Sequence, residues 1–373
     1  MINTEKFFNI LSSEIELFTG VPDSLLKDLC GCITDNVSEG KHIIAANEGA
    51  AVAIAAGHYL ATGKPALVYM QNSGIGNATN PLLSLADPKA YSIPMLLFVG
   101  WRGEPGVKDE PQHLKQGEVT LSLFDAMNIP YMIIDENETN AEKQFFQLLT
   151  RAKSTSSPHA AIIRKNLFSP YKLKNKLVNN FSMSREEALQ TVVDSLLEND
   201  IVISTTGKLS RELFEYRAKK GEGHDKDFLT VGSMGHSMSI AMGVALSKPD
   251  RLVYCLDGDG AVIMHLGGMT NIGSLGLKNF RHIVFNNGSH ESVGKQPTVG
   301  FQIDIPEIAM ACGYKNKYKV SDINDLNKVL KTFRTDEGPA LLEIKVNLAS
   351  REDLGRPTRT TIENKEDFMN GLQ

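Results

Sequence analysis

Two aspartates one residue apart, Asp257 and Asp259, close the apolar stretch in VYCLDGDGAV, residues 253–262. A carboxylate at the end of a buried strand is costly unless a cation faces it. A helix that begins at this point would offer free N–H groups to a phosphate, and Asp259 would repel that phosphate unless a cation lay between them. Mg²⁺ bridges protein carboxylates and phosphates in this way, so the stretch predicts a magnesium–phosphate site.

A second oxygen ligand is expected from the end of a neighbouring strand. The sequence RHIVFNNGSHES, residues 281–292, reads as a strand that ends at Asn286 and Asn287. Residues 261–285 separate it from the glycine–aspartate turn, which leaves room for one helix and one strand. An amide oxygen suits a hard cation, so this second turn is predicted to complete the site.

The pattern of glycine–aspartate–glycine, helix, strand and asparagine pair resembles the binding motif of thiamine-diphosphate-dependent decarboxylases. The resemblance implies that thiamine diphosphate and Mg²⁺ are the cofactors. It assigns the metal to the side chains of Asp259 and Asn287 and to the backbone carbonyl of Ser289. Gly258, Gly260 and Ala261 would then lie at the cofactor. A nicotinamide-binding fold is the weaker interpretation, because G-x-G-x-x-G follows the first strand of neither half.

Two further positions match the same family. Glu48, in AANEGAAVAIAAG, corresponds to the glutamate that hydrogen-bonds the aminopyrimidine ring, although a glutamate near a helix start is also a favourable charge. Met234, between glycines in GSMG with Gly232 preceding it, corresponds to the apolar residue under the bent cofactor, although methionine is more often plain core. Thr206 and Gly207 open another helix and are predicted to contact the diphosphate.

A finer resemblance, covering nearly the whole chain, is to the phosphonopyruvate decarboxylase group. It rests on GVPDSLL, YSIPMLLFVGWRGEPGVKDEPQHLKQG, HESVGKQPT and REDLGRPT. It implies a carboxy-lyase that converts 3-phosphonopyruvate to 2-phosphonoacetaldehyde and CO₂ in phosphonate biosynthesis. Sulfopyruvate decarboxylase shares parts of this set, and Lys295 stands where glycine is expected, so a sulfonate or another anionic 2-oxo acid stays an alternative substrate.

Acid–base catalysis is assigned by the same resemblance. Asp23, in GVPDS, matches the acid/base aspartate of related decarboxylases, and it could instead be a helix N-cap. His113, in DEPQH, resembles the histidine of that set, and it could instead be a surface loop residue. Which group protonates the carbon that CO₂ leaves stays open.

The predicted substrate pocket combines strand-end polar residues with cationic loops. Arginine binds a phosphonate in bidentate fashion, and each charged residue has the alternative of being a solvated loop charge. The substrate-binding candidates are Gln71, Asn72, Ser73, Arg102, Lys108, His290 and Lys295. The roles of Arg351 and Arg356 in the tail, like that of Lys295, stay open.

Short apolar runs alternate with helical patterns along the chain, which predicts an α/β protein with two doubly wound parallel sheets buried on both faces. We expect the pyrimidine-binding (PYR) type of thiamine-diphosphate fold in residues 1–168 and the diphosphate-binding (PP) type in residues 185–348. A linker, 169–184, and a polar tail, 349–373, complete the chain. The linker is too short to hold the middle domain of larger relatives.

The composition indicates a soluble protein without a nucleic-acid partner. The formal net charge is −5 over 373 residues, and the longest apolar runs are too short to cross a bilayer. The four cysteines are predicted to be reduced, buried and structural, which with a charged N-terminus favours a cytoplasmic location. The family resemblance implies a homodimer or larger assembly with the active site between subunits. A non-catalytic thiamine-diphosphate-binding protein is the alternative class.

Overall fold

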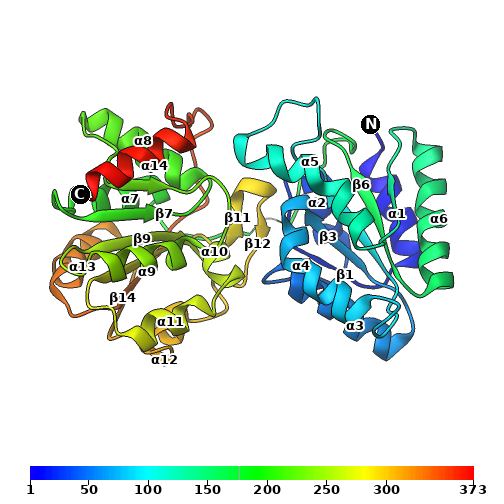
Figure 1. Cartoon of the computed structure of the whole chain (residues 1–373), viewed down its shortest axis with the longest axis horizontal. Helices are drawn as coiled ribbons and strands as arrows, with labels where there is room; N and C mark the ends of the chain where they lie inside the picture. Colours follow the sequence, from blue (N-terminus) through cyan, green and yellow to red (C-terminus); the bar gives the residue numbers. More distant parts are fainter. Residues whose placement is uncertain (176) are drawn as a thin grey trace. The chain divides into compact units, whose positions relative to one another are not determined.

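The computed structural model describes residues 1–175 and 177–373. It separates into two compact units. The first comprises residues 1–175 together with His290–Pro297, and the second comprises Leu177–Ser289 and Thr298–Gln373. Figure 1 shows each unit as a central sheet flanked by helices. The short segment His290–Pro297 therefore groups with the first unit, whereas the sequence had placed it in the second domain.

The first unit contains a six-stranded parallel sheet with the order β2-β1-β3-β4-β6-β5. Register pairs Phe18 with Leu67 and Leu67 with Leu96, so the starts of the central strands are level. The strands are β1 (Phe18–Gly20), β2 (His42–Ile44), β3 (Leu67–Gln71), β4 (Met95–Gly100), β5 (Tyr131–Ile133) and β6 (Pro158–Ile163).

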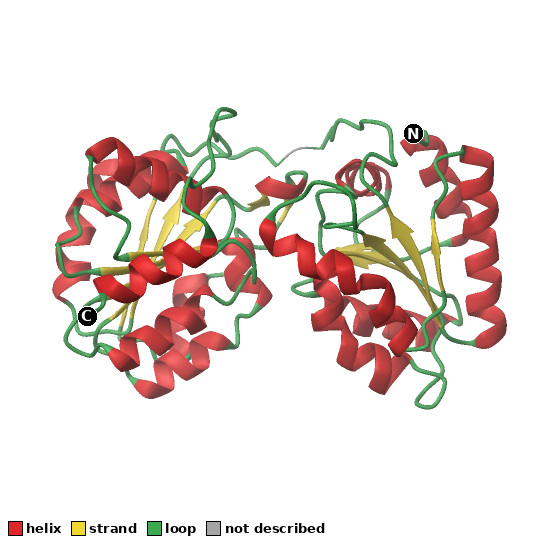
Figure 2. Ribbon diagram, turned by 45° about the horizontal axis from the view of Figure 1, so that its top comes forward, coloured by secondary structure: helices red, strands yellow, loops and turns green. Residues whose placement is uncertain are grey.

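Helices cover both faces of this sheet, as Figure 2 shows for the red helices around the yellow strands. One face carries α1 (Thr4–Glu14), α2 (Lys27–Asn36) and α6 (Glu138–Thr155). The other carries α3 (Glu48–Thr62), α4 (Ile75–Pro81) and α5 (Pro111–Ala126). Short helical turns, Asn72–Gly74 and Leu82–Ala86, flank α4.

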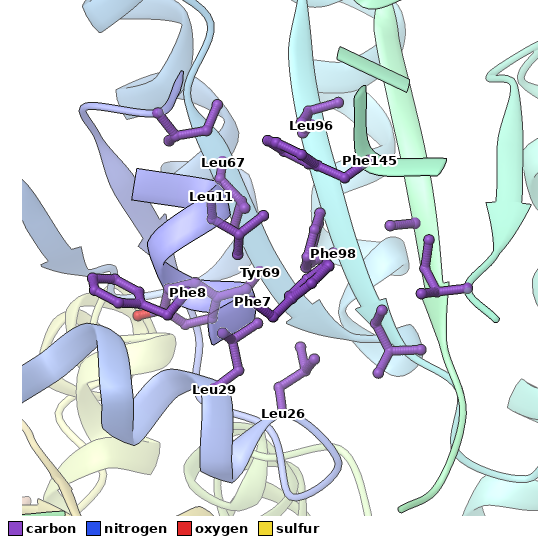
Figure 3. Packing of buried hydrophobic residues seen from close by; sticks show 14 of the residues in the cluster. Phe7, Phe8, Leu11, Leu26, Leu29, Leu67, Tyr69, Leu96, Phe98 and Phe145 are labelled. Atoms are coloured by element: carbon purple, nitrogen blue, oxygen red, sulfur yellow. The ribbon is translucent and has the colours of Figure 1, made fainter. Parts of the chain in front are cut away.

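Aromatic packing builds the first of these cores. Figure 3 shows Phe7, Phe8 and Leu11 of α1 against Tyr69 and Phe98 of the sheet. The rings of Phe7 and Phe98 lie 6.4 Å apart, centre to centre, in a tilted arrangement. Burial of such side chains on both faces is what fixes the sheet, and with it the strand ends that carry polar residues.

The second unit repeats this architecture. Its parallel sheet has the order β13-β14-β10-β9-β7-β8. The strands are β7 (Ile201–Ser204), β8 (Asp227–Leu229), β9 (Val253–Gly258), β10 (Phe280–Asn286), β13 (Asn316–Val320) and β14 (Ala340–Lys345). A separate two-stranded hairpin, most of which groups with the first unit, pairs β11 (Ser289–His290) with β12 (Gln296–Pro297).

Helices again cover both faces. One face packs against α7 (Arg185–Asp194), α8 (Lys208–Lys220) and α13 (Ile323–Thr335). The opposite face packs against α9 (Ser237–Ser247), α10 (Asp259–Met264), α11 (Gly268–Leu275), α12 (Ile305–Ala311) and α14 (Thr361–Gly371). The sequence predicted one helix after the glycine–aspartate turn, and this is wrong in one detail: α10 ends at Met264, and α11 begins only at Gly268.

The first half of the segment that joins the two sheets is held by hydrogen bonds to Asp35 of the first unit. Tyr171 donates its hydroxyl to Asp35, and the backbone N–H groups of Lys174 and Asn175 also donate to the Asp35 carboxylate. At the other end Ser184 caps α7 in a capping box with Glu187. The described part of the linker contains no helix or strand.

All four cysteines are free, and Cys30, Cys32 and Cys255 are buried, as expected. Cys312 is only partly buried, which corrects the prediction for that residue. Within the described residues, no helix combines the length and the apolar character that a membrane crossing requires.

Candidate active site

The predicted site residues of the first unit follow the carboxyl ends of four successive strands. Asp23 comes after β1, Glu48 after β2, Gln71 ends β3, and Arg102 comes after β4. Because the strands are parallel, these ends meet at one edge of the sheet, where ligands bind in open α/β folds.

Glu48 is the first residue of α3, directly after the N-cap Asn47, whose side chain accepts a hydrogen bond from the Ala50 N–H. The glutamate is only 5% exposed. Its Oε2 accepts a hydrogen bond of 2.7 Å from Asn77 Nδ2, and a side chain at Gly74 would overlap its Oε1. The carboxyl is thus enclosed on two sides, and Asn77 is a partner that the sequence analysis did not identify.

Asp23 is 1% exposed. Its Oδ2 accepts a hydrogen bond of 2.9 Å from the Leu25 N–H, while Oδ1 has no hydrogen-bond partner among the described residues. Burial raises the pKa of Asp23 to about 6, although Leu25 and the nearby Arg102 act in the opposite direction. The N-cap of α2 is Leu26, so the alternative of Asp23 as that cap is wrong.

Arg102 is oriented by its neighbours. Its Nε donates to Asp109 Oδ2 at 2.7 Å, its Nη2 donates to Asp109 Oδ1, and its Nη1 donates to Ser24 Oγ at 2.8 Å. The hydrogen bonds to Asp109 raise the pKa of Arg102. The bond to Ser24 places this guanidinium beside the residue that follows Asp23.

Asn72 supports the backbone of Arg102 through hydrogen bonds. It is 1% exposed, and its Nδ2 donates to the Arg102 carbonyl and to Thr120 Oγ1. Its Oδ1 accepts from the Arg102 N–H at 3.2 Å. Asn72 therefore supports Arg102. Gln71 and Ser73 are partly exposed, and Gln71 Nε2 donates a hydrogen bond of 2.6 Å to Ser73 Oγ.

His113 lies in the first turn of α5 rather than in a loop. Burial, followed by the charge of Arg102, lowers its pKa to about 4, so the ring is neutral near pH 7. Lys108 is exposed in the turn before α5. The structure thus groups Asp23, Arg102 and His113 in one unit.

The segment His290–Pro297 also belongs to the first unit, where β12 contacts α2. Burial lowers the pKa of His290 to about 4. Lys295 is exposed and has a backbone φ of 65°, a conformation in which glycine carries no steric cost. A lysine in this conformation is strained, which is consistent with the glycine expected at position 295.

In the second unit, Asp259 begins α10 and is 2% exposed. Thr298 donates its hydroxyl to Asp259 Oδ2, and the backbone N–H of Asn287 donates to the same carboxylate. Burial raises the pKa of Asp259 to about 6, although these hydrogen bonds oppose the shift. The two predicted metal-binding side chains are therefore neighbours at the ends of β9 and β10.

Asn287 and Ser289 form the turn beside this carboxylate. Both are buried, and Asn287 Oδ1 accepts the Ser289 N–H at 3.0 Å. Gly300 closes the other side, since a side chain there would lie 2.6 Å from Asp259 Oδ2. Thr298 and Gly300 were not predicted as site residues, although QPTVG, residues 296–300, follows the asparagine pair closely in the sequence.

Two of the remaining predicted cofactor residues, Gly207 and Met234, lie in or beside turns with positive φ. Gly207 has φ 101° at the start of α8, and Ser233 and Gly235 have φ 51° and 84° on either side of Met234. Met234 is only partly buried, which disfavours its interpretation as plain core. Beside these turns the buried hydroxyl of Thr205 has no hydrogen-bond partner among the described residues.

A buried cluster lies behind the turn at Gly258. Cys255, Asp257 and His282 are the one group of potential metal ligands that the described residues bring within 4.8 Å of one another. His282 Nε2 lies 3.6 Å from Asp257 Oδ2, and His282 Nδ1 lies 3.3 Å from the Tyr314 hydroxyl. Asp257 Oδ1 accepts the Gly258 N–H at 3.2 Å, so the cluster supports the turn from inside the core.

Comparison with known families matches both units. The model for the N-terminal thiamine pyrophosphate (TPP) binding domain of thiamine pyrophosphate enzymes covers residues 4–127. The model for the C-terminal TPP binding domain covers residues 205–344. The first match covers β1–β4 of the first sheet, and the second covers β8–β10, β13 and nearly all of β14 of the second sheet. No middle domain is indicated between them.

Individual relatives narrow the family. Phosphonopyruvate decarboxylase of Streptomyces viridochromogenes is 33% identical over 92% of this chain and 88% of its own length. The enzyme of the same name from Streptomyces hygroscopicus is 32% identical over 91% and 86%. Sulfopyruvate decarboxylase of Methanosarcina acetivorans is 28% identical over 88% and 87%. The chain belongs to the family of thiamine-diphosphate-dependent 2-oxo acid decarboxylases that includes the phosphonopyruvate decarboxylases, and it is a carboxy-lyase.

Proposed function

We propose that this enzyme converts 3-phosphonopyruvate to 2-phosphonoacetaldehyde and CO₂, as a step of phosphonate biosynthesis, with thiamine diphosphate and Mg²⁺ as cofactors. The observation that carries the proposal is the identity of 33% and 32% to two phosphonopyruvate decarboxylases over about nine tenths of the chain. The oriented Arg102 beside Asp23 supports it, because the substrate carries a dianionic group next to the reacting ketone.

The residues of the second unit fit a magnesium ion. Asp259 is an almost fully buried carboxylate, and burial alone would favour its protonated form. Asn287 adds an amide oxygen on the same edge, and Ser289 adds a backbone carbonyl. A cation held by one carboxylate and neutral oxygens, with phosphate oxygens completing its shell, is the arrangement that Mg²⁺ prefers. The turns at Thr206–Gly207 and Gly258–Ala261 would hold the diphosphate.

Bound thiamine diphosphate supplies the electron sink that lets CO₂ leave a 2-oxo acid. Glu48 would hold a proton against the aminopyrimidine ring, and the hydrogen bond from Asn77 to its Oε2 would fix the orientation of the carboxyl. Met234 would support the cofactor from below. Asp23 would give or take a proton near the reacting carbon, and its buried Oδ1, which has no hydrogen-bond partner among the described residues, supports this role.

The cationic residues of the first unit would bind the phosphonate. Arg102 spends two nitrogens on Asp109 and one on Ser24, and a guanidinium carries five N–H donors, so further donors remain for an anion. His113 near pH 7 is neutral and can donate one hydrogen bond without adding charge. His290, Lys108 and Lys295 are further candidates for the substrate pocket.

A substrate panel tests the proposal. Release of CO₂ and aldehyde is measured from 3-phosphonopyruvate, sulfopyruvate and pyruvate, with and without thiamine diphosphate and Mg²⁺. We expect the highest kcat/KM for 3-phosphonopyruvate and dependence on both cofactors. Faster turnover of pyruvate, or release of inorganic phosphate in step with CO₂, would refute the assignment.

Sulfopyruvate is the second candidate substrate. It is favoured by the 28% identity to a sulfopyruvate decarboxylase over 88% of the chain. A sulfonate carries one negative charge where a phosphonate near neutral pH carries up to two, so the pH profile separates the candidates. If phosphonopyruvate is the substrate, kcat/KM rises as the second phosphonate proton is lost, and sulfopyruvate shows no such rise.

We also propose that the enzyme is a homodimer or larger assembly. Subunit mixing tests whether residue 48 of one copy and residue 259 of another complete a single site. Glu48→Gln and Asp259→Asn variants, each inactive alone, would regain about a quarter of wild-type activity after random exchange of subunits. No recovery, with exchange confirmed by mass spectrometry, would contradict a site shared between copies.

A further inference from the structure

Two adjacent asparagines follow β10, and the predicted metal site uses only the second. Asn286 is fully buried. Its Nδ2 donates to Glu343 Oε1 and to the Gly300 carbonyl, each at 2.7 Å, and its Oδ1 accepts the Gly288 N–H at 3.0 Å. Both N–H groups and the oxygen of this amide are therefore engaged, which no aspartate or leucine of similar size could reproduce.

Glu343, on the neighbouring strand β14, is 1% exposed. Its Oε2 has no hydrogen-bond partner among the described residues. The nearest cation that the structure pairs with it is Lys319, whose Nζ lies 3.6 Å from this oxygen and 2.8 Å from Asp304 Oδ2. A buried carboxylate with so little compensation is costly, so Glu343 is better explained by what it holds than by stability.

The chain of contacts leads from Asn286 to the carboxylate of Asp259. The Gly300 N–H donates to Thr298 Oγ1 at 3.1 Å, and the Thr298 hydroxyl donates to Asp259 Oδ2. A side chain at position 300 would lie 2.6 Å from Asp259 Oδ2 and 2.8 Å from Asn286 Oδ1. The turn 298–300 thus lies directly between the asparagine and the aspartate.

We propose that Asn286 and Glu343 are positioning residues for the metal site. Glu343 fixes the amide of Asn286, Asn286 holds the turn 298–300, and Thr298 on that turn directs one oxygen of Asp259 away from the ion so that the other faces it. Neither Asn286 nor Glu343 touches metal or substrate. The inference rests on the proposed Mg²⁺–thiamine diphosphate site, and it divides the labour of the asparagine pair: Asn287 binds the metal and Asn286 orients the loop.

Two substitutions, one on each side of the hydrogen bond between Asn286 and Glu343, test this network. Asn286→Asp keeps the size but removes both donors and sets a second carboxylate against Glu343. We expect it to weaken the Mg²⁺ affinity, measured by calorimetry at saturating thiamine diphosphate, by about 10- to 100-fold, as for other outer-shell partners. Glu343→Gln alone still accepts from Asn286, so it should cost about fivefold or less.

The double variant Asn286→Asp/Glu343→Gln provides the rescue. The amide introduced at position 343 can donate to the carboxylate introduced at position 286, which removes the contact between two carboxylates but leaves the Gly300 carbonyl without its donor. Mg²⁺ affinity should therefore recover in part relative to Asn286→Asp. Glu337→Gln, an exposed glutamate paired with Lys278, is the matched control and should bind Mg²⁺ as the wild type does. Thermal unfolding without cofactor verifies that each variant is folded.

A folded Asn286→Asp variant with wild-type Mg²⁺ affinity, or a double variant no better than the single one, overturns the proposal. Should Asn286→Asp fail to fold, Thr298→Val removes only the hydroxyl that contacts Asp259, and an unchanged Mg²⁺ affinity in that variant overturns it equally. A wild-type protein that binds neither Mg²⁺ nor thiamine diphosphate would instead refute the proposed function, and this inference with it.

Discussion

At the end of its third strand the first unit carries Gln71 and Asn72, whereas the second unit carries Gly258 and Asp259 at the end of the corresponding strand. The correspondence holds because the sheets share one plan. When strands are counted within each unit and the hairpin β11–β12 is set aside, both orders read 2-1-3-4-6-5. The same four strand ends therefore carry different residues: acids and an arginine in the first unit, glycine turns and the oxygens proposed to bind the metal in the second.

The difference shows how one architecture separates two kinds of chemistry. Asp23 and Asp259 are both buried, and burial raises the pKa of each to about 6. Asp23 keeps one oxygen without a hydrogen-bond partner among the described residues, which suits a group that exchanges protons. Asp259 accepts a hydrogen bond from a hydroxyl and lies close to Gly300, which suits a carboxylate held in one orientation.

The largest expected effect concerns Glu48 of the first unit, whose substitution should reduce kcat but preserve cofactor binding. Glu48→Gln keeps the shape but cannot share a carboxyl proton, so kcat should fall by about 10²- to 10⁴-fold. Calorimetry should still detect thiamine diphosphate binding, because the second unit would hold the diphosphate and metal. Glu118→Gln, exposed on α5, is the control. Turnover near the wild-type level would favour a non-catalytic role for residue 48.

In the second unit we expect the opposite result, namely that a substitution weakens cofactor binding. Asp259→Asn removes the carboxylate from the metal site and should weaken Mg²⁺-dependent thiamine diphosphate binding by at least about 100-fold, more than the loss of an outer-shell partner. Isothermal titration at several Mg²⁺ concentrations measures this loss, with the exposed Asp250→Asn as a control. Tight cofactor binding by the Asp259 variant would remove the distinction between the units.

Asp23 predicts a pH-dependent stability. Its pKa is about 6 in the folded protein against 3.8 for the ordinary side chain, so the folded state keeps a proton that the unfolded state loses. The free energy of unfolding therefore falls as pH rises through this window, by about 2 to 3 kcal/mol in total. Asp23→Asn escapes that loss and should be more stable than the wild type at about pH 8, while losing activity.

Urea unfolding without cofactor at about pH 8 and about pH 4 measures the effect. The stabilisation by Asp23→Asn should nearly vanish at the lower pH, where the wild-type carboxyl is largely protonated in the folded state and about half protonated in the unfolded state. Glu142→Gln, on the exposed face of α6, should show no such pH dependence. An equal effect at both pH values would mean that the substitution acts through packing instead of charge.

The smallest expected effect compares two glycines at strand ends. A side chain at Gly100, the end of β4, would overlap Asp23 Oδ2, whereas one at Gly258, the end of β9, meets only the Phe285 carbonyl at 4.0 Å. Gly100→Ala should therefore cost about 1 to 3 kcal/mol of stability, and Gly258→Ala should leave the cofactor-free protein unchanged while weakening cofactor binding. Equal melting temperatures of the two variants would contradict this contrast.

Local patterns were sufficient to predict the fold. Buried apolar runs separated by helical segments predicted two parallel sheets, and both are present. Ser184 and Asn47 cap α7 and α3 by the ordinary rules of helix capping, so these two helix starts are consistent with the local sequence. The glycine–aspartate and asparagine turns were correctly placed at neighbouring strand ends because such turns follow directly from the strand pattern.

Contacts between distant parts of the chain were not readable. Thr298 bonds Asp259 from 39 residues away, and Glu343 meets Asn286 across 57 residues. The second pair depends on the register between β10 and β14, which sets Val284 opposite Glu343, and a register is fixed by the whole core. The bond of Asn72 to Arg102 was hidden for the same reason, since β3 and β4 must first align.

The first unit is discontinuous in sequence, since it includes His290–Pro297. A fragment truncated near residue 176 would therefore lack a stretch of its own structure, and the surface of α2 that β12 contacts would be left bare. Dissecting the protein into autonomous halves at the linker is for this reason unfavourable, and a peptide with the sequence of residues 290–297 is the natural supplement for an isolated N-terminal fragment.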